Sequence, residues 1–140
     1  MKKKGILNRQ LAGLVAGLGH TDCVMICDAG FPIPKGAEYV DLAMCAGVPS
    51  FVDCLNLLLS EAIFDEVTIA QEMSVHNPET FSYLENLFRN HKRNVIPQTE
   101  FMPMASGAKF IIRTGELKPY SNIYLYSASG VEKFNLDYVI

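Results

Sequence analysis

The first quarter of the chain places a histidine and two carboxylates around a short apolar segment. His20 and Asp22 precede the run Cys23-Val24-Met25-Ile26-Cys27, and Asp28 follows it. Imidazole exchanges protons near neutral pH, and a carboxylate accepts hydrogen bonds from hydroxyl groups or orients a base. The run predicts a buried strand spanning roughly 17–20 Å, so we expect His20 and Asp28 toward opposite ends of it. Both serve one pocket only if the chain folds back or if subunits share the pocket.

Each of these two residues has a structural alternative. His20 follows Gly19, which we expect to end a first helix, and a cation at that place stabilises a helix C-terminus. Asp28 lies where ligands of α/β proteins gather, at the carboxyl end of a strand, but it also suits a cap for the turn at Ala29-Gly30. The sequence leaves both alternatives open.

A second polar cluster, Tyr120-Ser121-Asn122, precedes the last expected strand. Phenol, hydroxyl and amide groups are neutral hydrogen-bonding partners suited to polyhydroxylated ligands. The alternative is a Pro-Tyr turn in which Asn122 opens the strand. His76 and His91 are weaker candidates, because one precedes a helix cap and the other ends that helix.

Motifs for metals and nucleotides are missing from the sequence. Cys23 and Cys27 would lie about 13 Å apart on one strand face, too far for one zinc ion. With Cys45 and Cys54 they are expected to be buried, reduced thiols. No His-Glu-x-x-His segment, phosphate-binding loop or Gly-x-Ser-x-Gly segment occurs. The sequence therefore predicts no metal site.

Length and composition predict one domain over residues 1–140. The chain is 49% apolar with a mean hydropathy of +0.15, which favours subunit interfaces. A net charge of −3 without a basic patch gives no support for nucleic-acid binding. No apolar run approaches the ~20 residues of a membrane span, and residues 5–10 interrupt any signal-peptide core. We therefore expect a cytoplasmic protein without a membrane segment.

Apolar spacing and capping signals alternate between helix and strand along the chain. We expect helices over about residues 8–18, 51–62, 78–91 and 98–105, and strands over about 23–28, 39–44, 67–70, 94–96, 109–113 and 122–126. This order predicts an α/β domain with a central, mostly parallel sheet flanked by helices. The tail over about 128–140 is not assigned.

Up to about Tyr126, the sequence resembles the D-ribose pyranase and L-fucose mutarotase family, more closely its ribose pyranase branch. The most specific matching segment is Asp28-Ala29-Gly30-Phe31-Pro32-Ile33-Pro34. Further matching segments are Gly5–Asn8, Leu18–Asp22, Gly47–Phe51, His76–Pro78, Arg113–Glu116 and Pro119–Ile123.

The resemblance implies a cytoplasmic, cofactor-free isomerase that interconverts the pyranose and furanose forms, and the anomers, of a free aldose such as D-ribose. It also implies a homo-oligomer, commonly a decamer of two stacked pentamers, with sites between subunits. His20 is then the catalytic acid/base, and Asp28 and Tyr120-Ser121-Asn122 contact the sugar. A mutarotase for L-fucose or another aldose remains an alternative, as does a non-catalytic sugar-binding or transport-accessory protein.

Two positions depart from the family pattern. Family members usually carry His or Arg three positions before a Phe, where this chain has Gln98 before Phe101. The ribose branch often has Lys directly after that Phe, and here the residue is Met102. Gln98 donates and accepts hydrogen bonds without a charge, so we expect it to contact the sugar and to alter which aldose is preferred.

Overall fold

The computed structural model describes residues 1–130. Along the chain, these residues form the elements α1 (Arg9–Ala16), β1 (Cys23–Cys27), β2 (Tyr39–Asp41), α2 (Phe51–Leu59), β3 (Phe64–Ala70), α3 (Met73–His76), α4 (Pro78–Leu87), β4 (Lys92–Ile96), α5 (Gln98–Phe101), the 3-10 helix η1 (Met102–Gly107), β5 (Phe110–Arg113) and β6 (Ile123–Ser127). Within this part of the chain, no helix is long and apolar enough to span a membrane.

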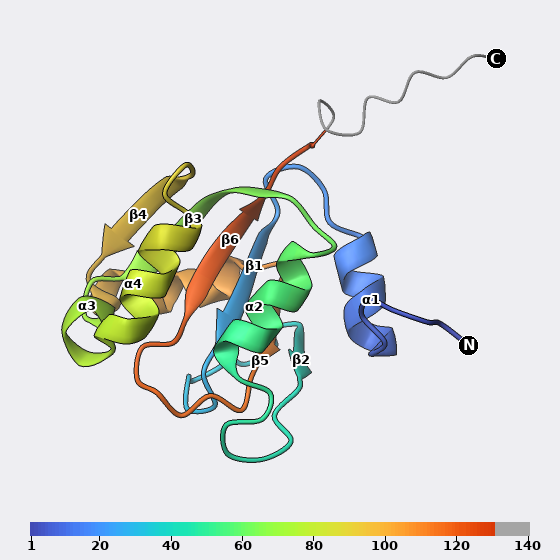
Figure 1. The fold of residues 1–140 in the computed structure, drawn as a ribbon, viewed down its shortest axis with the longest axis horizontal. Coiled ribbons are helices and arrows are strands. Elements are labelled where there is room, and N and C mark those ends of the chain that lie inside the picture. The colour runs from blue at the N-terminus through green and yellow to red at the C-terminus, as the bar shows by residue number, and fades with distance from the viewer. Residues whose placement is uncertain (131–140) are drawn as a thin grey trace.

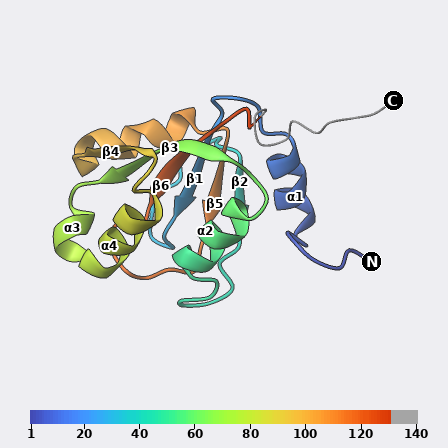
Figure 2. The ribbon, with the colours of Figure 1, turned by 45° about the horizontal axis from the view of Figure 1, so that its top comes forward.

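The strands of residues 1–130 form one sheet in the order β2-β5-β1-β6-β3-β4, which Figure 2 shows from right to left. β1 pairs in parallel with β5, as do β5 with β2 and β3 with β4. β6 pairs antiparallel with both β1 and β3. Strands β1 to β5 therefore run in one direction and β6 alone runs against them, which confirms the mostly parallel sheet.

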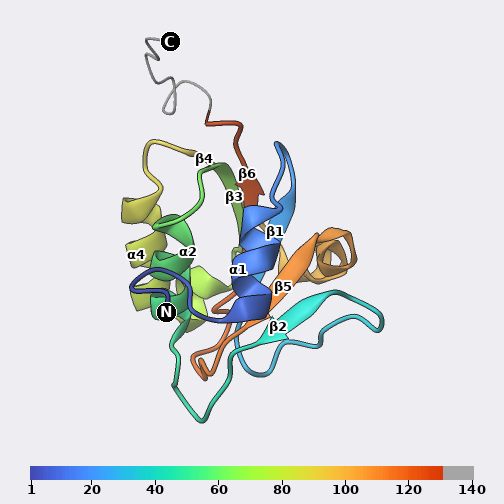
Figure 3. The ribbon, with the colours of Figure 1, turned by 90° about the vertical axis from the view of Figure 1, so that its right-hand side faces the viewer.

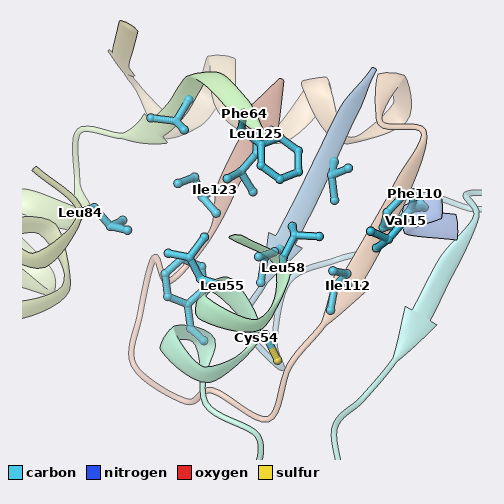
Figure 4. Close-up of a cluster of buried hydrophobic side chains, with 14 of the residues drawn as sticks. Val15, Cys54, Leu55, Leu58, Phe64, Leu84, Phe110, Ile112, Ile123 and Leu125 are labelled. Carbon is cyan, nitrogen blue, oxygen red and sulfur yellow. The ribbon is translucent and has the colours of Figure 1, made fainter. Parts of the chain in front are cut away.

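Helices cover both faces of this sheet. α2 and α4 lie on one face and the segment of α5 and η1 lies on the other, as Figures 1 and 3 show. On the first face, apolar residues of α1, α2 and α4 pack on β1, β3, β5 and β6 to form the larger core (Figure 4). On the second face, Phe101 and Ala105 pack on Met25, Ile111 and Tyr124. The apolar strand residues that the sequence predicts to be buried therefore lie between two helical layers.

Side-chain caps start the helices where the sequence places them. Ser50 and Asp53 form the expected capping box of α2. Asn77 caps α4, and Pro78 occupies its first turn. The prediction that Gly19 ends the first helix is wrong, because α1 ends at Ala16 with Gly17 as its C-cap.

Other boundaries differ from the expectation at element ends. The helix expected to reach residue 91 ends at Leu87, and the short helix α3 was not expected. The helix expected over 98–105 divides into α5 and η1, where Pro103 removes a backbone donor. The unassigned tail is described only to Gly130, so the remainder of that prediction lies outside the described residues.

The cysteine prediction is partly wrong. All four thiols are free, and Cys27 and Cys54 are buried, but Cys45 is exposed in the loop before α2. Burial raises the pKa of the Cys27 thiol to about 12, so this thiol stays protonated at neutral pH. Residues 44–48 around Cys45 are all exposed, which the apolar character of the local sequence does not reveal.

We expect Leu55→Ala to lower the free energy of unfolding by about 2–5 kcal/mol, because it leaves a cavity in place of a side chain that has no exposed surface. Urea denaturation at a fixed protein concentration measures this change. The control is Leu7→Ala, since Leu7 is 68% exposed and its loss should change stability by less than about 0.5 kcal/mol. Equal unfolding midpoints for the two variants would contradict this account of the core.

Candidate active site

A cavity of about 500 Å³ opens at the edge of the sheet where β1 ends and β6 begins. The residues that line it come from the loop after β1, from α5 and η1, and from the orange segment between β5 and β6 that runs below β6 in Figure 1. They are Asp28, Gly30, Phe31, Pro32, Gln98, Met102, Glu116, Leu117, Pro119, Tyr120 and Asn122. Ligands of α/β proteins bind outside the carboxyl ends of strands, and this cavity has that position.

Asp28 and Asn122 both line the cavity and form hydrogen bonds with each other. The Asp28 backbone N–H donates to Asn122 Oδ1 at 2.9 Å, and Asn122 Nδ2 donates to Asp28 Oδ2 at 3.3 Å. The Gly30 N–H donates to Asp28 Oδ1 at 3.0 Å. The carboxylate therefore has a fixed orientation and still has acceptor capacity for a ligand hydroxyl. Asp28 serves as the turn cap and as a cavity residue together.

The surroundings of the Asp28 carboxyl disfavour its charged form. Burial raises its pKa above the ordinary carboxyl value, although the hydrogen bonds from Gly30 and Asn122 lower it in part. The negative charge of Glu116 acts in the same direction as burial. Because the folded pKa is raised, ionised Asp28 lowers the stability of the fold at pH values above its titration range. A carboxylate kept at such a cost is typical of a functional site.

Glu116 lines the cavity, but its carboxylate is already bound to backbone. Its two oxygens accept from the Phe51 N–H at 3.2 Å and from the Lys118 N–H at 3.1 Å. The first of these bonds places a negative charge at the start of α2, where the helix dipole favours it. Glu116 therefore anchors the segment between β5 and β6 to α2.

Gln98 brings a half-buried side-chain amide to the cavity from the start of α5. Its backbone N–H donates to Glu72 Oε2 at 2.9 Å, which fixes the helix start. Its side-chain Oε1 is buried and receives no hydrogen bond from any group within residues 1–130. An unpaired buried acceptor costs about 1–3 kcal/mol, which a donor hydroxyl on a ligand would recover. Met102, the other departure from the family pattern, lines the same cavity.

The Tyr120-Ser121-Asn122 segment divides between the cavity and the interior. Tyr120 and Asn122 line the cavity, whereas Ser121 is fully buried and its Oγ accepts from Asn77 Nδ2 at 3.0 Å. Tyr120 has a left-handed backbone with φ of 56°, which costs a non-glycine residue roughly 1–2 kcal/mol. The His76 ring stacks on the Tyr120 ring at a centroid distance of 5.4 Å.

His20 lies at the opposite end of β1 and does not line the cavity. Its side chain is exposed in the loop before β1. The strand rise separates Asp22 from Asp28 by roughly 20 Å, and the chain does not fold back to bring His20 to Asp28. Of the predicted site residues, the structure therefore brings together Asp28, Gln98, Tyr120 and Asn122, but not His20.

The backbone on both sides of His20 is held in place. The Gly19 N–H donates to Asp22 Oδ2 at 2.6 Å, and the Thr21 N–H donates to Ser127 O at 2.7 Å. Lys109 Nζ donates to Asp22 Oδ2 at 2.7 Å, which lowers the pKa of Asp22, and to Gly17 O at 2.8 Å. Because Lys109 supplies the cation at the end of α1, the helix-capping alternative for His20 gains no support.

Sequence reasoning missed two residues that shape this edge. Glu116 lies in a turn-rich segment, where a carboxylate is usually solvated. Only the structure distinguishes it, by the hydrogen bonds that its carboxylate accepts from the Phe51 and Lys118 N–H groups. Asn77 was recognised as a helix cap, but its contacts with the Pro119–Ser121 segment involve residues more than forty positions away. In the described part of the chain, no three His, Cys, Asp or Glu side chains gather where a metal ion could bind.

Comparison with known proteins identifies relatives over nearly the whole chain. A family model described as the RbsD / FucU transport protein family matches residues 1–131. The D-ribose pyranase of Laribacter hongkongensis is 42% identical over 127 residues, which are 91% of this chain and 97% of the relative. The D-ribose pyranase of Streptomyces coelicolor is 46% identical over 125 residues, which are 89% and 95% of the two chains.

Solved structures agree with these matches. Bacillus subtilis RbsD complexed with D-ribose is 41% identical, with a TM-score of 0.87 over 91% of this chain and 98% of that chain. The fucose mutarotase of Streptococcus pneumoniae, solved with L-fucose, has a TM-score of 0.72 at 19% identity over 87% and 93% of the two chains. The second likeness shows the fold alone. On the family model and the relatives together, the chain belongs to the RbsD / FucU family.

Proposed function

We propose that the protein is a D-ribose pyranase, an isomerase that interconverts the pyranose and furanose forms of free D-ribose and its anomers. The observation that carries the proposal is the cavity at Asp28, Gln98, Tyr120 and Asn122, in a chain 41% identical to a protein solved with D-ribose. Carboxylate, amide and phenol groups at one cavity suit a ligand with several hydroxyl groups.

The lining supports a free rather than a phosphorylated sugar. Within residues 1–130, the cavity is lined by two carboxylates, Asp28 and Glu116, and by no Lys, Arg or His. Among the groups that one chain supplies, a phosphate group would meet negative charge without a Lys or Arg to pair with. Neutral hydroxyl groups instead donate to Asp28 and to the unpaired oxygen of Gln98.

The reaction needs a proton donor and acceptor, and the two carboxylates that line the cavity already accept hydrogen bonds from other groups of the chain. Ring opening takes the proton from the anomeric hydroxyl, breaks the bond between the anomeric carbon and the ring oxygen, and gives a proton to that oxygen. Closure through the neighbouring hydroxyl reverses both transfers on a ring of different size. An imidazole near neutral pH performs both transfers, and we assign this role to His20. The steps require no resident cofactor.

The position of His20 leads us to propose that sites are shared between subunits. His20 and the cavity lie at opposite ends of β1, so a cavity of one chain receives the exposed His20 of another. This arrangement agrees with the homo-oligomer, a decamer of two stacked pentamers, that the family resemblance implies. The cytoplasmic location expected from the sequence stays a prediction.

The second candidate is a pyranase or mutarotase that prefers another aldose, such as L-fucose. Gln98 and Met102, which both line the cavity, keep it open, because family members usually carry His or Arg at position 98 and the ribose branch often carries Lys at position 102. The candidate of another class, a non-catalytic sugar-binding or transport-accessory protein, retains the cavity but has no use for an acid/base at His20.

We expect His20→Ala to lower the rate of ribose ring exchange by about 10²- to 10⁴-fold, because it removes the proton donor and acceptor. Magnetisation-transfer NMR on equilibrated D-ribose measures exchange between pyranose and furanose signals, with L-fucose as a second substrate. His91→Ala, which changes an exposed histidine away from the cavity, is the control and should leave the rate unchanged.

The outcomes separate the candidates. Exchange on ribose that is lost in His20→Ala supports the pyranase and the role of His20. Exchange on L-fucose alone moves the protein to the mutarotase candidate. Ribose binding without exchange in the wild type supports the binding protein.

Mixing two inactive variants tests the shared site. His20→Ala keeps the cavity intact, and Asp28→Asn keeps His20 intact. Subunits refolded together in equal amounts should recover about one quarter of the wild-type exchange rate, because about one site in four then combines an intact His20 with an intact Asp28. Mixed oligomers that stay as inactive as their parents would show that both residues must belong to one chain.

We expect Gln98→His to raise the exchange rate on D-ribose, since it restores a basic side chain at a position that lines the cavity. The same NMR measurement compares it with Gln10→His, which makes the identical change on an exposed face of α1. An unchanged ribose rate in Gln98→His would exclude a selective role for this position.

A further inference from the structure

The residue between α3 and α4, Asn77, binds the segment that carries Tyr120 and Asn122 to the cavity. Asn77 is 4% exposed and lies at the end of α3 and the start of α4. Its Nδ2 donates to Pro119 O at 3.0 Å and to Ser121 Oγ at 3.0 Å. These two acceptors are the immediate neighbours of Tyr120 in the chain, so the amide holds the backbone on both sides of a cavity residue.

The residue between these two anchors has an unfavourable conformation. Tyr120 has φ of 56°, and non-glycine residues stay in that region only where the surroundings hold them. The Tyr120 carbonyl accepts from the Asn122 N–H at 2.8 Å, so the position of Tyr120 also affects the residue that orients Asp28. On the outer side, the His76 ring stacks on the Tyr120 ring.

We propose that Asn77 is a positioning residue for sugar binding, which holds Tyr120 and Asn122 at the cavity through the Pro119 carbonyl and the Ser121 hydroxyl. The inference deepens the proposed function and rests on it for the identity of the sugar. Asn77 does not line the cavity, so it acts only through the residues that it holds. Removing its amide donors frees the segment to leave the strained backbone conformation.

The same side chain also caps a helix, but with a different atom. Asn77 Oδ1 accepts from the Thr80 N–H at 3.4 Å at the start of α4. A serine retains an N-cap acceptor but has neither the reach nor the two donors of the amide. Asn77→Ser therefore separates the capping role from the positioning role.

The chain offers a matched control at another helix. Asn8 caps α1 through its Oδ1, which accepts from the Leu11 N–H at 2.9 Å, and it lies away from the cavity. Asn8→Ser makes the identical change at a helix start that the proposal does not involve. Any effect of helix capping alone should appear in both variants.

The experiment measures ribose affinity by calorimetry and the ring signals of Tyr120 by NMR, at a temperature well below unfolding. The Tyr120 ring is followed because His76 directly precedes Asn77 in the chain, so the signals of His76 move with any substitution of Asn77. The Tyr120 signals are assigned by their loss in Tyr120→Phe. We expect Asn77→Ser to weaken D-ribose binding by about tenfold, as for the loss of one or two hydrogen bonds, and to shift the Tyr120 signals toward those of a phenol ring that no longer stacks on His76. Asn8→Ser should change neither. If Asn77 only capped α4, the Tyr120 signals would not move in the folded protein.

Wild-type affinity and unchanged Tyr120 ring signals in Asn77→Ser would overturn the proposal, as would an equal loss of affinity in Asn8→Ser. If Asn77→Ser does not fold, Asn77→Asp replaces it, because a carboxylate keeps the cap and meets the Pro119 carbonyl with an acceptor in place of a donor. A wild-type protein that binds no D-ribose would refute the proposed function, and the Tyr120 ring signals would still decide whether Asn77 positions Tyr120.

Discussion

The insertion of β6, antiparallel, between β1 and β3 is the constraint on which the cavity depends. Because β6 runs against its neighbours, its first residues meet the last residues of β1 at one edge of the sheet. Asn122 thereby reaches both the backbone and the carboxylate of Asp28, across 94 positions of sequence. A parallel β6 would bring its carboxyl end to this edge instead, and the Tyr120–Asn122 segment would lie at the other end of the sheet.

The cavity residues are fixed by backbone groups as much as by each other. Gly30 orients Asp28, Glu72 fixes the start of the helix that carries Gln98, and the Phe51 N–H holds Glu116. Each of these bonds comes from a different element, so the rigidity of the site derives from the whole sheet edge. The half-buried carboxylate of Asp28 and the unpaired Oε1 of Gln98 are unfavourable for the stability of the fold, and the hydrogen bonds around them hold both groups in place.

Much of the fold follows from local sequence patterns, whereas the contacts of the site do not. The capping box at Ser50 and the Asn77-Pro78 helix start are local signals, and both are confirmed. Asp28 and Asn122 were predicted separately as strand-end residues, but no local pattern encodes the direction of β6 that joins them. The second role of Asn77 and the bonds of Glu116 likewise depend on residues distant in sequence. The separation of His20 from the cavity follows from strand length, which the apolar run between His20 and Asp28 predicted correctly.

The distance between His20 and the cavity has a consequence for how activity depends on assembly. If sites are shared, a single folded chain carries His20 at one end of its sheet and the cavity at the other, and it has no complete active site. Specific activity then depends on protein concentration, because dilution dissociates the subunits and removes the activity without unfolding the chains. A newly synthesised chain would remain catalytically silent until it meets its neighbours, so quaternary assembly itself acts as the final step of maturation.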